Sequence, residues 1–129
     1  MIRKATAADI PAILELVSAN LGTLLPRSHS DYVELLPMTW VAVSGETVVG
    51  SCVLEIYSPK IAEIRSFVVH KDHRGQGFGK GLIDAAVSEA RSRNIYEIMV
   101  VTSTPQYFEN LNFGACLNEK YALFWNGHK

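Results

Sequence analysis

A strand that leads directly into a glycine-rich turn and then into a helix constrains the fold of this chain more than any other feature. Residues 61–70 form an apolar, β-rich run, and the turn that follows reads Arg74-Gly75-Gln76-Gly77-Phe78-Gly79-Lys80-Gly81. Apolar side chains then recur with helical spacing over 77–93. Glycine lets a backbone approach a ligand closely, and the first turn of a helix offers unpaired N–H donors. The junction therefore predicts an anion site, to which Arg74 and Lys80 add positive charge.

The turn matches neither of two common phosphate-binding motifs. A Walker P-loop has four residues between its first glycine and Gly-Lys, whereas only three separate Gly75 from Gly79 here. The residue after Lys80 is also glycine rather than Ser or Thr. A dinucleotide fingerprint needs G-x-G-x-x-G, but Lys80 or Leu82 stands at the last glycine in the two registers. Both motifs are excluded.

The order of the remaining elements predicts a mixed α/β fold with one central sheet. We expect the order β-α-α-β-β-β-α-β-α-β-β, without an internal repeat. The 95–102 run is expected to lie parallel to the 61–70 strand through a right-handed crossover. The elements expected before and after the turn are a strand at 2–5, a helix from the Thr6 cap to Gly22, a weaker helix ending at Pro37, a hairpin of 40–43 and 48–57, the strand at 61–70, the helix at 77–93, the strand at 95–102, a short helix from Pro105 and two closing strands.

Size and composition set limits on what the chain does. With 129 residues, of which 48% are apolar, we expect one domain over 1–129. Twelve basic and thirteen acidic residues exclude nucleic-acid binding through a general positive field. Cys52 and Cys116 form neither a metal spacing nor a disulfide framework, so we predict two buried thiols, no metal and a reducing compartment. No run reaches the roughly 18 apolar residues of a membrane span, and we expect a cytoplasmic protein.

The glycine-rich turn and its flanks carry a resemblance to a known family. Arg74-Gly75-Gln76-Gly77-Phe78-Gly79 fits the pattern Arg/Gln-x-x-Gly-x-Gly/Ala and resembles the acyl-CoA motif of the GNAT superfamily. Ile64-Arg65-Ser66-Phe67-Val68-Val69-His70 is similar to the central strand of that family, and Tyr107-Phe108-Glu109-Asn110-Leu111-Asn112-Phe113 to its late aromatic-acidic motif. The resemblance covers nearly the whole chain. It implies the GNAT fold and an acetyl-CoA-dependent N-acetyltransferase.

The resemblance also implies a set of cofactor-binding residues. In such a fold the sheet splays after the central strand, and pantetheine amides pair with backbone left open there. Backbone amides of the turn would hold the pyrophosphate. Phe108 stands where many relatives carry a tyrosine that protonates the CoA thiolate, so we expect the thiolate to leave without a protein acid. The cofactor-binding residues implied are Phe67, Val68, Val69, Arg74, Gly75, Gln76, Gly77, Phe78, Gly79, Lys80 and Phe108.

Glu63 is the candidate general base. Acyl transfer needs a neutral amine, so a base must take a proton from the acceptor ammonium, directly or through water. Glu63 lies four residues before Phe67, where several GNAT enzymes carry a glutamate with this role. The plain alternative is a surface carboxylate paired with Arg65 or Lys60.

Three further segments resemble the acetyltransferase domain of N-acetylglutamate synthases, especially short single-domain forms. They are Leu24-Leu25-Pro26-Arg27-Ser28, Lys60-Ile61-Ala62-Glu63-Ile64-Arg65-Ser66 and Thr102-Ser103-Thr104-Pro105-Gln106-Tyr107-Phe108. This resemblance implies that Arg27 and Lys60 bind substrate carboxylates and that Thr104 supplies a hydroxyl, although solvated surface charge is the alternative for both cations. Ser103, in place of an arginine, and Asn112, in place of a glycine, depart from the family pattern.

Three functions stay open at this point. The first is acetylation of a small amine that carries a carboxylate, such as glutamate or another amino acid. The second is a non-catalytic module that binds acetyl-CoA and regulates a partner, and the third is acetylation of a protein or peptide. The oligomeric state also stays open: a homodimer is an alternative to a monomer, because no interface can be read from the sequence.

Overall fold

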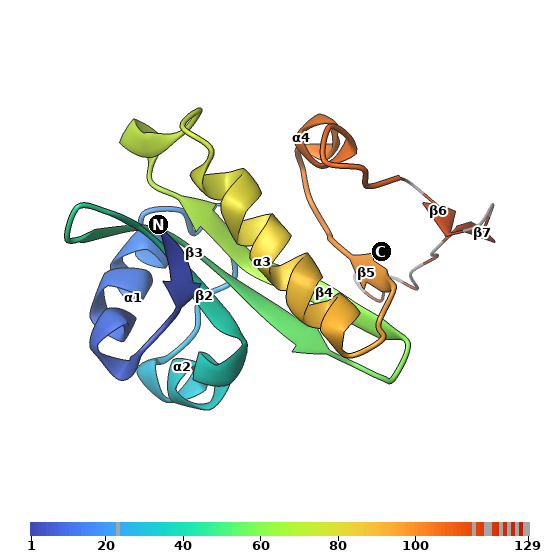
Figure 1. Ribbon diagram of the computed structural model, residues 1–129, viewed down its shortest axis with the longest axis horizontal. Coiled ribbons are helices and arrows are strands. Elements are labelled where there is room, and N and C mark those ends of the chain that lie inside the picture. Colours follow the sequence, from blue (N-terminus) through green and yellow to red (C-terminus); the bar gives the residue numbers. More distant parts are fainter. Residues whose placement is uncertain are drawn as a thin grey trace.

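A five-stranded sheet in the order β1-β2-β3-β4-β5 forms the centre of the computed structural model (Figure 1). The structure describes residues 1–22, 24–114, 116–117, 120–121, 123, 125 and 127. The strands are β1 Ile2–Lys4, β2 Thr39–Ser44, β3 Thr47–Ile56, β4 Ile61–Val69, β5 Glu97–Met99, β6 Cys116–Leu117 and β7 Lys120–Tyr121. The helices are α1 Ile10–Ser18, α2 His29–Leu35, α3 Phe78–Ser92 and α4 Pro105–Glu109, with 3-10 turns η1 Ala7–Asp9, η2 Leu36–Met38 and η3 Lys71–His73.

The expected α/β order is confirmed, and β5 is parallel to β4 as predicted. Two details differ. The strand expected over 95–102 is reduced to the three residues of β5. The two closing strands are present, but they pair with each other in a separate two-stranded sheet.

The first helix is also shorter than its apolar pattern suggested. It ends at Ser18 rather than at Gly22, and the Asn20 side chain just beyond this end donates to the Leu16 carbonyl at 2.8 Å. Leu21 lies past the end of the helix and is exposed, whereas Leu16 is buried.

Local capping fixes where the first two helical segments begin. The Asp9 carboxylate accepts from the Thr6 N–H at 2.8 Å and from Arg3 Nη1 at 2.7 Å. Ser28 and Asp31 form the same reciprocal arrangement at the start of α2. Such boxes satisfy N–H groups that have no partner inside the helix.

The sheet separates two hydrophobic clusters. On one face α3 packs Leu82, Ile83, Ala86 and Ala90 against the sheet; on the other, α1 and α2 pack Ile10, Ile13, Val17 and Tyr32 against it. Figure 1 shows α3 running along the sheet with α1 and α2 to its side. Cys52 is a buried free thiol, as predicted, and burial raises its pKa to about 12. The side chain of Cys116 lies outside the described residues.

Candidate active site

Strand β4 carries most of the candidate site, and a bulge divides it into two parts. Its register against β3 runs from Ala62 opposite Ile56 to Arg65 opposite Val53, and then resumes with Val68 opposite Ser51. Two residues of β4, Ser66 and Phe67, thus stand against a single residue of β3. Ser66 has a φ of 51°, a left-handed conformation that β-bulges use to bend a strand and redirect side chains.

Beyond its first three residues, β4 has no described strand beside it on the β5 side. The pairing ends at Glu63 opposite Met99, while β4 continues to Val69. The His70 N–H donates to the Val49 carbonyl at 2.7 Å, so the backbone at position 70 faces β3. Because successive residues alternate, Val68 also faces β3 and Val69 faces the open edge. Arg74 Nε occupies part of this edge, donating to the Val69 carbonyl at 3.1 Å.

The glycine-rich turn joins this open end of β4 to the first turn of α3. Gly75 and Gly77 have φ values of 78° and 89°, which a residue with a Cβ adopts only with strain. Gly77 is the N-cap of α3, a helix of 15 residues. The turn therefore presents the helix start beside the open β4 edge, as the sequence predicted. Lys80 lies in this first turn and forms an exposed ion pair with Asp84 at 2.7 Å.

An aromatic cluster lines the junction between β4, α3 and α4. Phe108 is buried and packs edge-on against Phe67, with ring centroids 5.7 Å apart. Tyr107 packs on Phe67 as well, at 5.8 Å. A Cβ placed on Gly79 would meet the Tyr107 hydroxyl and would lie 3.1 Å from the Phe67 ring, so a larger residue there would require the Tyr107 side chain to move. Burial raises the pKa of Tyr107.

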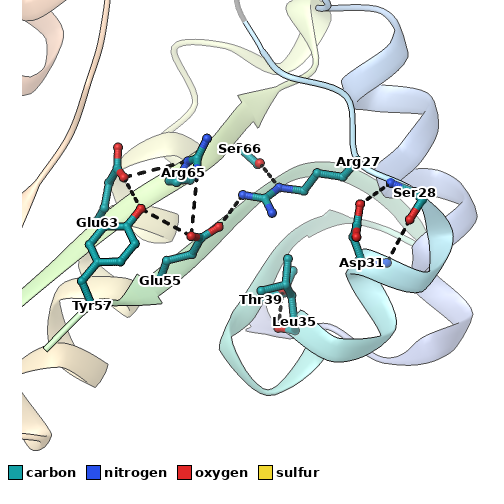
Figure 2. A network of polar contacts seen from close by, with 10 residues as sticks. All are labelled: Arg27, Ser28, Asp31, Leu35, Thr39, Glu55, Tyr57, Glu63, Arg65 and Ser66. Atoms are coloured by element: carbon teal, nitrogen blue, oxygen red, sulfur yellow. Dashed lines mark hydrogen bonds and ion pairs between the residues drawn. The ribbon is translucent and has the colours of Figure 1, made fainter. Parts of the chain in front are cut away.

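On the face covered by α1 and α2, a polar network extends across β3 and β4 (Figure 2). Arg27 Nη2 lies 2.5 Å from Glu55 Oε1, and Arg27 Nε donates to the Ser66 hydroxyl at 2.8 Å. The Arg27 side chain is only 16% exposed. It is therefore not a solvated surface charge, and the Ser66 bulge turns a hydroxyl toward it.

Glu63 belongs to the same network. The Tyr57 hydroxyl donates to Glu63 Oε1 at 2.5 Å and lies 3.4 Å from Glu55 Oε2. Arg65 lies between the two carboxylates, 3.7 Å from Glu55 and 3.9 Å from Glu63. Burial alone would lower the pKa of Arg65, because it disfavours the charged guanidinium. The negative charges of Glu55 and Glu63 outweigh this effect, and the pKa of Arg65 is raised. The pairing of Glu63 with Arg65 that the sequence left open is therefore present, but Glu63 is buried and also accepts from Tyr57, so it is not a solvated surface carboxylate.

A cavity of about 450 Å³ adjoins this network. Glu55 and Tyr57 form part of its wall, and α2 and η2 supply the opposite wall with Glu34, Leu35 and Met38. It opens where β3 extends past the beginning of β2, since Thr39 is paired with Val53 and residues 54–56 continue beyond it.

The structure brings Arg27 and Glu63 into one network but leaves two other candidates outside it. Lys60 is exposed in the turn between β3 and β4, and Thr104 is exposed at the start of α4, where its hydroxyl lies 3.1 Å from that of Thr102. Sequence reasoning missed Glu55 and Tyr57. Their spacing of two residues, at the end of β3 and just after it, was a usable signal, because it places them on one face of the sheet.

Metal and membrane features are absent from the parts of the chain that the structure covers. Within these residues no three His, Cys, Asp or Glu side chains gather in a way that could hold a metal ion. None of the described helices combines the length and the apolar character that crossing a membrane requires.

Comparisons with known sequences agree with this architecture. The profile described as the acetyltransferase (GNAT) family matches residues 11–113. Over 114 residues the chain is 30% identical to an N-acetyltransferase of Chlorobaculum tepidum, covering 87% of this chain and 74% of the relative. It is 28% identical to an amino-acid acetyltransferase of Mycobacterium tuberculosis, and the match covers 88% of this chain and 67% of that protein. A longer amino-acid acetyltransferase of Pasteurella multocida is 32% identical, but the match covers 87% of this chain and only 26% of that protein.

Solved structures share the fold. A Mycobacterium tuberculosis protein crystallised in complex with CoA superposes with a TM-score of 0.86 at 26% identity, covering 91% of this chain and 73% of that one. The N-acetylglutamate synthase of Neisseria gonorrhoeae, solved with coenzyme A and N-acetyl-glutamate, gives a TM-score of 0.81 at 23% identity. The match covers 86% of this chain and 27% of that one. The open β4 edge, the glycine-rich turn and the family match lead to one conclusion. The chain belongs to the acetyltransferase (GNAT) family and is an N-acetyltransferase that uses acetyl-CoA as its acetyl donor.

Proposed function

We propose that the acceptor is a small amine that carries a carboxylate, such as glutamate or another amino acid. One observation carries the proposal: the Arg27 guanidinium and the Glu63 carboxylate lie in a single network, linked through Glu55 and Tyr57. Arginine suits the two-point recognition of a carboxylate, and a buried carboxylate suits the removal of a proton from an ammonium. The two groups together match the two ends of an amino acid. The amino-acid acetyltransferases among the relatives support the same class of acceptor.

The cofactor would lie along the open edge of β4 and against the start of α3. Backbone groups at Phe67 and Val69 are the candidates for pantetheine, with Val69 facing the open edge directly. Val68, which the resemblance also implied, is not available in this way, because its backbone faces β3. Amides of Gly75, Gln76, Gly77, Phe78, Gly79 and Lys80 are the candidates for the pyrophosphate. The positive end of the α3 dipole favours an anion there. Arg74 would exchange its contact with the Val69 carbonyl for a phosphate.

Acetyl transfer on this site removes two protons from the acceptor nitrogen. Glu63 would take the first from the acceptor ammonium, and the neutral amine would attack the thioester carbonyl. A C–N bond forms, the C–S bond breaks, CoA leaves as a thiolate, and the nitrogen gives its second proton to solvent as the amide forms. Phe108 has no proton to give and is packed against Phe67. The thiolate would therefore take its proton from solvent rather than from that position.

The acceptor carboxylate would compete with Glu55 for Arg27. The guanidinium already has one internal carboxylate within 2.5 Å, so binding exchanges one ion pair for another. The adjoining cavity would receive the acceptor side chain. Lys60 and Thr104 remain candidates for a second contact from the edges of the site.

The test is CoA-thiol release from acetyl-CoA across a panel of amino acids, the matching decarboxylated amines, polyamines and short peptides. We expect turnover with one or more amino acids, loss of turnover when the carboxylate is removed from the acceptor, and a large rise in acceptor KM in Arg27→Ala. Arg74→Ala should instead raise the KM for acetyl-CoA. Equal turnover of an amino acid and its decarboxylated amine would reject the carboxylate requirement.

The same panel separates the two alternatives. Acetyl-CoA binding without turnover on any acceptor would favour a regulatory module. Turnover confined to peptides would favour a protein acetyltransferase, and Arg27→Ala would then leave acceptor KM unchanged.

A further inference from the structure

The Tyr57 hydroxyl bridges two carboxylates that oppose each other across the β3–β4 hairpin. Glu55 and Glu63 are register partners, and like charges placed directly opposite on one face of a sheet repel each other. The Tyr57 hydroxyl lies 2.5 Å from Glu63 Oε1 and 3.4 Å from Glu55 Oε2 (Figure 2). The phenol thus stands between the two acids, and its stronger contact is with Glu63.

We propose that Tyr57 is a positioning residue, which holds the Glu63 carboxylate oriented for acceptance of the acceptor's proton. This inference rests on the base role proposed above for Glu63. Tyr57 itself does not exchange a proton with the substrate. It acts on the reaction only through the carboxylate that it binds.

The phenol is suited to donate at every pH at which the enzyme could work. Partial burial, followed by the hydrogen bond to Glu63, raises the pKa of Tyr57 to about 12. A phenol that stays protonated keeps its O–H available to the carboxylate that it contacts. Tyr57 is also half exposed, at 51%, so its ring contributes little to the core and its role is not explained by packing.

The contacts of Glu63 leave the second oxygen of its carboxylate to accept the proton of the acceptor ammonium. Oε1 of Glu63 accepts from Tyr57 and is the atom that faces Arg65 at 3.9 Å. In Figure 2 the second oxygen of Glu63 points away from both groups. Because Oε1 is anchored, rotation of the carboxylate is restricted and the second oxygen keeps one direction.

Three other charged groups act on the same carboxylate. Glu55 on β3 repels it, Arg65 on β4 attracts it, and Arg27 acts indirectly by pairing with Glu55. Without the phenol, Glu63 would face Glu55 with only the 3.9 Å contact from Arg65 to hold its carboxylate in place.

The experiment compares Tyr57→Phe with the unchanged protein. Steady-state kinetics separates kcat from the KM values of the acceptor and of acetyl-CoA. We expect kcat to fall by about tenfold in Tyr57→Phe, because a hydrogen bond that orients the carboxylate is lost, while both KM values stay unchanged. Tyr96→Phe, which removes an exposed hydroxyl elsewhere, is the matched control.

A double-variant cycle decides whether Tyr57 acts through Glu63. If it does, Tyr57→Phe adds nothing to the loss in Glu63→Gln, and the KM for acetyl-CoA and the melting temperature stay unchanged in Tyr57→Phe. Additive losses, a raised acceptor KM without a change in kcat, or a fall in kcat accompanied by a lower melting temperature would overturn the inference. If Glu63→Gln slows turnover and Tyr57→Phe does not, the inference fails while the base role survives. An unaffected Glu63→Gln would remove the base role itself.

Discussion

Arg27 is held by a carboxylate of its own chain, with its Nη2 atom 2.5 Å from Oε1 of Glu55. Both side chains are largely buried, at 16% and 21% exposure. An acceptor that binds Arg27 through a carboxylate, as proposed above, would compete with a partner that is already in place. The strength of this internal ion pair would then limit how tightly such an acceptor binds.

Replacing Glu55 by glutamine should improve binding of the acceptor. Glu55→Gln keeps the shape of the side chain but removes the competing charge, so acceptor KM should fall roughly two- to fivefold. The KM for acetyl-CoA should not change. Steady-state kinetics with the best acceptor of the panel measures both values. Glu34→Gln, on the opposite wall of the same cavity, is a control with the same change of charge. A rise in acceptor KM for Glu55→Gln would show instead that Glu55 binds the acceptor ammonium.

Replacing Glu63 by glutamine should slow the chemical step while leaving cofactor binding intact. General base catalysis contributes about a hundredfold or more, so kcat near neutral pH should fall by at least that factor. The dissociation constant for acetyl-CoA, measured by calorimetry, should stay the same, because the turn that would bind it begins beyond the other end of β4. An unchanged rate would exclude Glu63 from proton transfer.

Alanine at Gly50 should destabilise the fold. A Cβ at this position would lie 3.0 Å from the Val68 carbonyl oxygen and 3.1 Å from Leu82 Cδ1. Overfilling of this kind costs about 1–3 kcal/mol, and urea unfolding should report a loss in that range. Gly22→Ala is the control, since a Cβ there would meet no atom within 4 Å. Equal stability of the two variants would contradict the close packing of β3 between β4 and α3.

Asp9 should make stability depend on pH in the acidic range. The hydrogen bond from Arg3, and then those from Thr6, lower the pKa of Asp9 against the opposing effect of burial. A carboxyl whose pKa is lower in the folded state stabilises the protein fully above its unfolded value of about 3.9, and this stabilisation is lost as pH falls through the folded value. Asp9→Asn should therefore be less stable than the unchanged protein at pH 6, with the difference shrinking toward pH 2. Asp84→Asn, which removes an exposed pair with Lys80, should not reproduce this dependence in urea titrations.

Signals carried by neighbouring residues were sufficient to predict much of the molecule. Thr6 with Asp9 predicted a helix start, and the glycines at 75 and 77 predicted a turn that other residues enter only with strain. The parallel placement of β5 followed from the handedness of the crossover. Each of these features depends on a few residues that are close in sequence.

Features that depend on strand register could not be predicted in the same way. Glu55 meets Glu63 only because the hairpin pairs them, and the bulge at Ser66 changes which residues lie opposite one another. The bulge also determines that Arg27 finds a hydroxyl on β4. Nothing in the local sequence around Ser66 favours a left-handed conformation, so the partners of Arg27 and Glu63 became visible only with the structure.

The short ladder between β4 and β5 affects how the folded state responds to its ligand. Three residue pairs join the two strands, and apolar contacts of Phe108, Leu111 and Phe113 supply much of the remaining attachment of this segment. A ligand lying along the open edge would contact both β4 and the segment of β5 and α4. Its binding free energy would add to the free energy of unfolding. Resistance to heat and to proteolysis would then follow the cellular supply of acetyl-CoA.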